Sequence, residues 1–179
     1  MVRSVNVIGR GRVGSAFAAR LEERGIDLRE DAELALLCVP DAAIADVARG
    51  LSPGHGWVGH VSGATPLSAL DPHERRFSLH PLQTLTRARG PEQLDGAWAA
   101  VTAETDEARE LAVELARVLG LEPFELEDDD KPLYHAGAVV ASNYLVTLHE
   151  AAAGLVAAAG VPPEALEPLY DVLAEATPR

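Results

Sequence analysis

The sequence predicts an α/β fold, with a mostly parallel sheet covered by helices on both faces, followed by a short all-helical segment. Apolar runs of strand length alternate with stretches of helical periodicity through residues 1–127. A glycine-rich turn joins the first strand-like run to the first helical one. From residue 128 onward the pattern is helical throughout. We therefore expect one domain at 1–127 and a helical segment at 128–179.

The first two units of the chain each lead from a strand into a helix. Residues 2–8 alternate and end apolar, and residues 15–24 have helical spacing. The run 34–39 is continuously apolar, and Asp41 after Pro40 is suited to cap the helix that follows. Continuous apolar runs of this length are typical of strands buried on both faces of a parallel sheet.

The alternation continues to residue 127. Four further strand patterns occur, at residues 57–61, 75–79, 97–103 and 122–126. A helix between the last two begins after Thr105, a favourable cap, and ends at Gly120. One helix of nearly thirty residues follows from residue 128, with an acidic start. Because it is apolar on most faces, we expect it to pack against a second copy of the chain, in a homodimer.

The composition is that of a globular protein. The chain has 179 residues, 47% hydrophobic and 24% charged. Its formal net charge of -13 disfavours nonspecific binding to nucleic acid or to an anionic membrane. No uninterrupted apolar run approaches the roughly 20 residues that span a bilayer. With one cysteine and no signal-like start, we expect a cytoplasmic protein without nucleic-acid or membrane partners.

The turn after the first strand has the spacing G-x-G-x-x-G between a strand and a helix, which is the context of a Rossmann-like dinucleotide-binding turn. The first glycine permits the tight turn, the second lets the backbone approach a pyrophosphate, and the third lets helix and strand pack closely. The two arginines of the turn either reach phosphate or are ordinary surface residues. The candidates for cofactor binding here are Gly9, Arg10, Gly11, Arg12, Val13 and Gly14.

The stretch 25–41 is shorter than such a fold predicts, because a single strand-like run stands where a strand, a helix and another strand normally occur. An acid that reads a ribose is expected about 20 residues beyond the turn, near Glu30 and Asp31. Arg29 beside them is a candidate for a 2′-phosphate. These residues do not decide between NAD and NADP, of which we slightly prefer NADP as the expected cofactor. The alternative is that these residues form only a charged loop.

Further candidates follow other strand patterns, at the edge where parallel sheets bind ligands. Val39 and Pro40 are placed to border a nicotinamide. Ser62 offers a hydroxyl, next to the backbone N–H groups of a glycine loop, to a carboxylate or hydroxyl of a substrate. His80 offers an imidazole for proton transfer, although a single histidine after a strand is more often structural.

The long helix carries polar side chains on an otherwise apolar surface. His135 and Asn143 are candidates for contact with a substrate, because polar groups on such a helix must face water, a partner or a ligand. The six histidines show neither H-x-H nor H-E-x-x-H spacing, so we expect no metal site.

Five segments of the chain together resemble one family. They are "VNVIGRGRVGSAFAARL", "LLCVPDAAIADVA", "GHVSGATPLSAL", "FSLHPLQTL" and "YHAGAVVASNYLVTLHEAA". They are similar to predicted oxidoreductases that join a Rossmann-like domain to a C-terminal helical domain of unknown function, relatives of 6-phosphogluconate dehydrogenase, ketopantoate reductase and pyrroline-carboxylate reductase. The resemblance implies NAD(P) binding at the glycine turn and a cleft between the sheet and the long helix, usually completed in a dimer. In this chain the second unit and the helical end are both shorter than in the family.

Two hypotheses follow. The first is an NAD(P)-dependent oxidoreductase that transfers a hydride to or from a small polar, carboxylate-bearing substrate. Ser62 and Asn143 would position the substrate, and His80 or His135 would exchange the proton. The second is a non-catalytic dimer that keeps the fold as a nucleotide sensor or interaction module, which the short stretch 25–41 favours.

Overall fold

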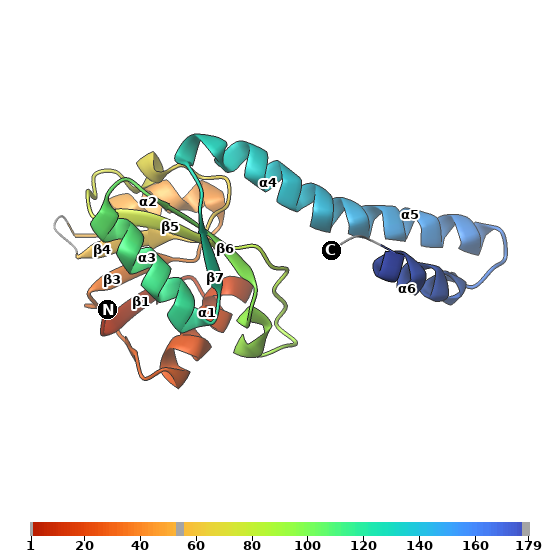
Figure 1. Cartoon of the computed structure of the whole chain (residues 1–179), viewed down its shortest axis with the longest axis horizontal. Coiled ribbons are helices and arrows are strands. Elements are labelled where there is room, and N and C mark those ends of the chain that lie inside the picture. Colours follow the sequence, from red (N-terminus) through yellow and green to blue (C-terminus); the bar gives the residue numbers. More distant parts are fainter. Residues whose placement is uncertain (1, 53–55, 177–179) are drawn as a thin grey trace. The chain divides into compact units, whose positions relative to one another are not determined.

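The computed structural model describes residues 2–52 and 56–176 (Figure 1). The chain divides into two compact units, Met1–His135 and Ala136–Arg179. The first turns of the long helix, which the sequence analysis assigned to the helical segment, thus belong to the first unit.

The first unit is built on one sheet. Within the described residues it has seven strands in the order β2-β1-β3-β4-β5-β6-β7. Their bounds are β1 Ser4–Ile8, β2 Asp27–Leu28, β3 Leu34–Leu37, β4 Trp57–His60, β5 Arg76–Pro81, β6 Trp98–Ala103 and β7 Glu122–Glu125. All neighbouring strands are parallel except β5 and β6, which are antiparallel. The predicted mostly parallel α/β fold is confirmed.

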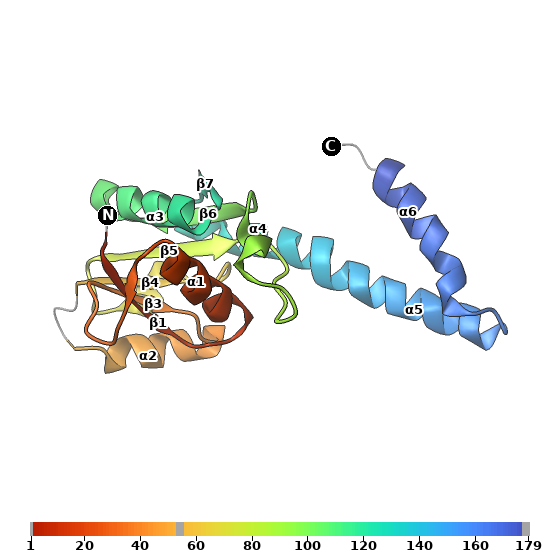
Figure 2. The same ribbon diagram turned by 90° about the horizontal axis from the view of Figure 1, so that it is seen from below.

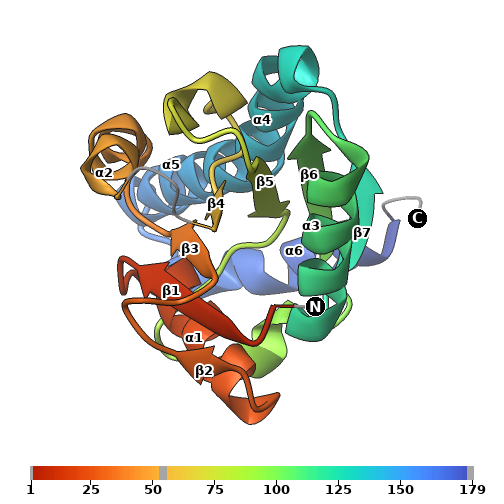
Figure 3. The ribbon, with the colours of Figure 1, turned by 90° about the vertical axis from the view of Figure 1, so that its left-hand side faces the viewer.

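Helices cover both faces of the sheet. Residues of α1 (Arg12–Glu23) and α3 (Asp106–Leu119) belong to one core cluster, whereas α2 (Ile44–Gly50) packs in another. Figures 2 and 3 show α2 and α3 on opposite sides of the strands. Thr105 caps α3 by accepting the N–H of Ala108 at 3.2 Å, and Gly120, with φ of 87°, ends it. The predicted ends of this helix are therefore correct.

The short stretch after α1 forms β2 and enters β3 with no helix between them. β2 pairs only with Ser4 and Val5 at the beginning of β1, and the N–H of Arg29 donates to the carbonyl of Val5 at 3.3 Å. β3 continues along β1 as far as Ile8. β2 therefore lies beside the amino end of β1, away from the glycine turn that follows Ile8.

The described part of the second unit is mostly helical and begins within α4 (Lys131–Val139). α4 is followed by a π-helical turn, η5 (Val140–Tyr144), by α5 (Leu145–Ala158) and by α6 (Glu167–Ala176). α5 and α6 approach each other through the rings of His149 and Tyr170, whose centroids are 4.8 Å apart. The helical stretch Asp128–Ala158 has 31 residues and contains an 18-residue window of mean hydropathy 1.2, so by length and composition alone it is apolar enough to cross a membrane. Core helices of soluble proteins meet the same criteria of length and composition.

Candidate functional site

The sequence-predicted residues of the first unit meet at the carboxyl ends of neighbouring strands. The glycine turn follows β1, and Val39 and Pro40 follow β3. Ser62 follows β4, and His80 is the penultimate residue of β5. Since these strands are adjacent in the sheet, their loops share the edge at which open parallel sheets bind ligands.

The glycine turn has the backbone arrangement that a dinucleotide requires. A Cβ at Gly9, where φ is 98°, would lie 2.5 Å from the carbonyl oxygen of Cys38, and one at Gly14 would lie 1.9 Å from the carbonyl oxygen of Gly9. A Cβ at Gly11 would meet nothing within 4 Å. The backbone at the start of α1 is therefore open at the second glycine, and this opening fits the pyrophosphate of a nucleotide.

Arg29 is not brought to this turn. Its guanidinium donates to Ser4 Oγ at 3.3 Å and lies 3.7 Å from a carboxylate oxygen of Asp31. The carbonyl of the neighbouring Glu30 accepts the side-chain N–H of Asn6 at 3.1 Å. Since Ser4 begins β1 and the glycine turn follows its other end, the geometry favours the charged-loop alternative for residues 29–31.

Two histidines and a tyrosine converge on the loop after β4. His80 Nδ1 lies 2.7 Å from Tyr134 Oη, and the rings of His80 and His135 meet edge to face with centroids 6.1 Å apart. A Cβ at Gly63 would lie 2.9 Å from both His135 Nδ1 and His80 Cε1. Only glycine therefore leaves room at this position for both imidazoles, which places the Ser62 loop against His80 and His135.

His80 and Tyr134 are both uncharged near neutral pH. Burial lowers the pKa of His80 to about 4, and the charges of His135 and Lys131 act in the same direction. Burial raises the pKa of Tyr134 to about 12. The hydrogen bond between His80 Nδ1 and the phenol of Tyr134 thus joins two neutral groups. The other ring nitrogen of His80, Nε2, remains for another partner. Nδ1 of His135 is buried and, among the described residues, has no hydrogen-bond partner, so a ligand or water is needed to satisfy it.

Ser62 holds its own loop together. Its Oγ accepts the N–H groups of Ala64 at 3.2 Å and Thr65 at 3.0 Å, and its own N–H donates to His60 Nδ1 at 3.2 Å. These contacts do not use the hydroxyl hydrogen of Ser62. Ser62 is 5% exposed, so its contribution to the fold accompanies any contribution to binding.

The sequence analysis missed Lys131 and Tyr134. Lys131 is the only lysine, is 1% exposed, and donates from Nζ to the carbonyl of Thr65 at 2.7 Å. Burial lowers its pKa to about 8, against the opposing charge of Asp128, whose carboxylate lies 3.6 Å from Nζ. The same carboxylate accepts the N–H of Leu67 at 3.1 Å.

These contacts fix the start of α4 to the loop after β4, and so place Tyr134 and His135. The i, i+3 and i+4 spacing of Lys131, Tyr134 and His135 puts all three on one side of a helix, a pattern that was available in the sequence. Asn143 lies in the second unit, within the π-helical turn, and is exposed. Its substrate-positioning role stays a prediction.

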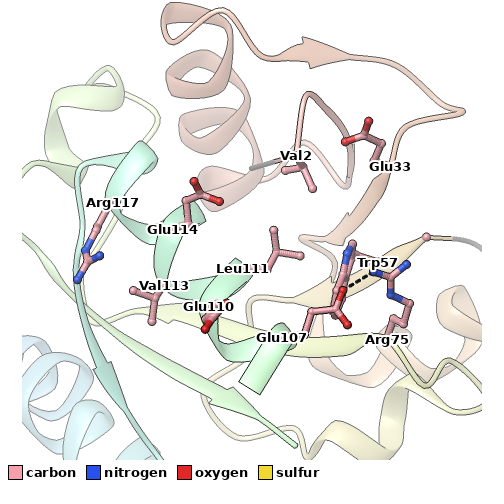
Figure 4. A pocket seen from close by; sticks show the side chains of 11 residues that line it. Val2, Glu33, Trp57, Arg75, Glu107, Glu110, Leu111, Val113, Glu114 and Arg117 are labelled. Atoms are coloured by element: carbon pink, nitrogen blue, oxygen red, sulfur yellow. Dashed lines mark hydrogen bonds and ion pairs between the residues drawn. The ribbon is translucent and has the colours of Figure 1, made fainter. Parts of the chain in front are cut away.

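A cavity of about 780 Å³ opens at the other edge of the sheet (Figure 4). It is lined by Glu33 before β3, by Trp57 at the start of β4 and by glutamates of α3. The guanidinium of Arg75 stands 4.3 Å over the Trp57 ring and pairs with Glu107 at 2.7 Å. Because this cavity lies at the amino ends of the strands, it is separate from the glycine turn and the histidines.

The fold and this site define a Rossmann-like protein with a dinucleotide-type glycine turn. Residues 97–178 match the model of one family, the Domain of unknown function (DUF2520). The resemblance to a Rossmann-like family with a C-terminal helical domain of unknown function is thereby confirmed. No curated protein matches the chain significantly.

Solved structures show the same fold. A protein from Bacteroides fragilis described as a "putative NADP oxidoreductase" is 18% identical with a TM-score of 0.82, over 97% of this chain and 79% of that one. Protein TM1727 from Thermotoga maritima is 23% identical with a TM-score of 0.73, over 97% and 70% of the two chains. Plasmodium falciparum pyrroline carboxylate reductase, solved with NADP bound, is 11% identical with a TM-score of 0.68, over 97% and 76%. At these identities the likeness shows the fold.

Proposed function

We propose that this protein is an NAD(P)-dependent oxidoreductase that transfers a hydride to or from a small polar substrate bearing a carboxylate. One observation supports this proposal most directly. The open backbone at Gly11 and the neutral, hydrogen-bonded His80 lie at the same edge of the sheet, at the carboxyl ends of its parallel strands. Two structural neighbours support it, one described as a "putative NADP oxidoreductase" and one solved with NADP bound. A bound nicotinamide dinucleotide supplies the hydride donor or acceptor.

The chain's own residues have distinct tasks in this proposal. His80 exchanges the substrate proton through Nε2, while Tyr134 fixes the ring by its hydrogen bond to Nδ1. The unsatisfied Nδ1 of His135 and the free hydroxyl hydrogen of Ser62 contact the polar groups of the substrate. Asn143 is the further positioning candidate. NADP as the preferred cofactor and a cytoplasmic location remain predictions.

A titration with NADPH and NADH tests cofactor binding. A dinucleotide at 100 times its dissociation constant stabilises a folded protein by about 2.7 kcal/mol, so we expect a clear rise in melting temperature. Thermal shift at up to millimolar concentrations of each cofactor is the measurement. No shift with either dinucleotide would contradict the proposed function.

His80→Asn is the matched variant for catalysis. It should bind the dinucleotide as the wild type does, because His80 lies at the carboxyl end of β5 and not in the glycine turn. Turnover, followed as NADPH absorbance with a panel of small oxo and hydroxy acids, should fall about 10²- to 10⁴-fold with loss of the proton-exchanging group. Normal turnover in this variant would show that the proton is exchanged elsewhere, with His135→Asn as the next variant to measure.

A non-catalytic nucleotide sensor is the second candidate. The two-residue β2 and the placement of Arg29 beside Ser4 favour it, because the adenosine side of the site is reduced. This candidate predicts dinucleotide binding in the wild type together with no oxidation or reduction of any member of the acid panel. The His80→Asn variant would then equal the wild type in every assay.

We also propose that the protein is a homodimer through its C-terminal helices. Large apolar side chains of α5 are more than half exposed, among them Leu145 at 65%, Leu148 at 67% and Leu155 at 75%. Exposed apolar surface of this extent marks an interface with a partner. We expect twice the chain mass by light scattering at micromolar concentration, and a monomer for Leu145→Glu/Leu148→Glu. A monomeric wild type, or sedimentation of the expressed protein with membranes, would contradict the dimer.

A further inference from the structure

A smaller cavity, of about 330 Å³, opens beside the glycine turn. One wall is α1, including Ser15, and the other is the loop that follows β5. Three arginines line it, Arg10 from the glycine turn and Arg87 and Arg89 from the loop. In a chain of formal net charge -13, three guanidinium groups around one small cavity form a local positive site.

The loop that carries Arg87 and Arg89 is held by Gln93, which is 5% exposed. Its Nε2 donates to the carbonyls of Thr86 at 3.2 Å, Arg89 at 3.2 Å and Gly90 at 2.9 Å. Its Oε1 accepts the N–H of Thr86 at 2.8 Å. The nitrogen and the oxygen of the side-chain amide thus both form hydrogen bonds with the loop backbone. These bonds hold in place the backbone that carries Arg87 and Arg89.

The same loop is attached to α1 through Arg20, a buried residue of that helix. Its guanidinium donates to Asp95 Oδ1 at 2.6 Å and to the carbonyl of Pro91 at 2.8 Å. The two walls of the cavity are therefore joined, and Arg87 and Arg89 keep their place beside the start of α1. A site arranged in this way binds a ligand with little ordering of the protein.

The positive charge of the cavity is only partly compensated. Arg89 Nε lies 3.7 Å from Glu92, whose carboxylate also accepts the N–H of Gly90 at 3.1 Å. Among the residues that the structure describes, no ion pair engages Arg10 or Arg87. Guanidinium groups without a carboxylate partner are suited to bind the oxygens of a phosphate.

We propose that this cavity is a phosphate-binding site, in which Arg87 and Arg89 act together with Arg10 beside the glycine turn. This proposal rests on the proposed function in one respect, that a dinucleotide is one source of the phosphate. Because Arg29 is directed to Ser4 at the far end of β1, the loop arginines replace it as partners for a phosphate at the carboxyl edge of the sheet. The phosphate belongs to the cofactor or to a phosphorylated substrate.

The test compares Arg87→Gln/Arg89→Gln with the wild type by calorimetric titration of NADPH, NADH and inorganic pyrophosphate. Loss of charge-assisted hydrogen bonds should weaken binding of at least one of these ligands tenfold or more. The matched control is Arg49→Gln/Arg117→Gln, which removes the same charge from exposed positions of α2 and α3 and should change affinity less than twofold. Both arginines of the tested loop are exposed, so the melting temperature without ligand should stay unchanged.

The pattern of losses identifies the source. A loss for NADPH alone assigns the 2′-phosphate, an equal loss for both dinucleotides assigns their pyrophosphate, and a loss for inorganic pyrophosphate alone assigns a phosphorylated substrate. Equal affinity of the wild type and the loop variant for all three ligands would overturn the site, as would a wild type that binds none. If the wild type binds pyrophosphate but neither dinucleotide, the proposed function fails while this site stands.

Discussion

Replacing Gly14 with alanine is expected to destabilise the protein by about 3 kcal/mol or more, whereas the same replacement at Gly11 is expected to change stability by less than about 1 kcal/mol. A Cβ at Gly14 would lie 1.9 Å from the carbonyl oxygen of Gly9 and 2.9 Å from Cys38 Cβ. The first contact is with backbone, so no change of rotamer relieves it. At Gly11 nothing lies within 4 Å of the added methyl group, and φ is -71°, which alanine adopts without strain.

The variants Gly14→Ala and Gly11→Ala should also separate an effect on stability from an effect on ligand binding. The methyl group of Gly11→Ala occupies the space through which the backbone approaches a pyrophosphate, so we expect at least tenfold weaker NADPH binding in a protein of nearly normal stability. Urea unfolding followed by circular dichroism gives the stability, and fluorescence titration gives the affinity. Normal NADPH binding by Gly11→Ala would show that the pyrophosphate lies elsewhere. Normal stability of Gly14→Ala would show that α1 is free to shift away from β1.

The features that the sequence predicted correctly have local causes. The ends of α3 followed from Thr105, whose side chain accepts a helix N–H, and from Gly120, whose positive φ ends the helix. The glycine turn was recognisable because its spacing reflects contacts within about thirty residues, such as that between Gly9 and Cys38. Ser62 and His80 were chosen by one rule, that ligands bind at the carboxyl ends of parallel strands; the structure places both at those ends, and their roles stay predictions.

The features that were missed depend on contacts between distant segments. The distance of Arg29 from the glycine turn follows from the pairing of β2 with Ser4 and Val5, a register that composition does not encode. The loop of Arg87 and Arg89 has an unremarkable sequence, and the hydrogen bonds of Gln93 and Arg20 reveal that it is held in place. Burial of Lys131 likewise depends on a partner 66 positions away, the carbonyl of Thr65.

Lowering the pH from 6.5 to 4 is expected to destabilise the protein by several kcal/mol, because two histidines are buried in their neutral form. Burial lowers the pKa of His60 to about 3 and that of His80 to about 4, whereas both titrate near 6.5 in the unfolded chain. Between pH 6.5 and pH 4 the unfolded state binds more protons than the folded state, so the free energy of unfolding falls as the pH falls. Above about pH 7.5 both histidines are neutral in the folded and unfolded states, so neither changes the stability.

Each histidine contributes at most about 3 kcal/mol over this interval, and the pair about 6 kcal/mol, which approaches the stability of a typical domain. The matched variant is His60→Asn, whose amide oxygen is suited to accept the N–H of Ser62 in place of Nδ1 but does not titrate. Its stability should start lower at pH 7 and decline about half as steeply between pH 6.5 and 4 in urea unfolding series. A decline as steep as that of the wild type would show that His60 is not held neutral, and that protonation of carboxylates accounts for the acid sensitivity.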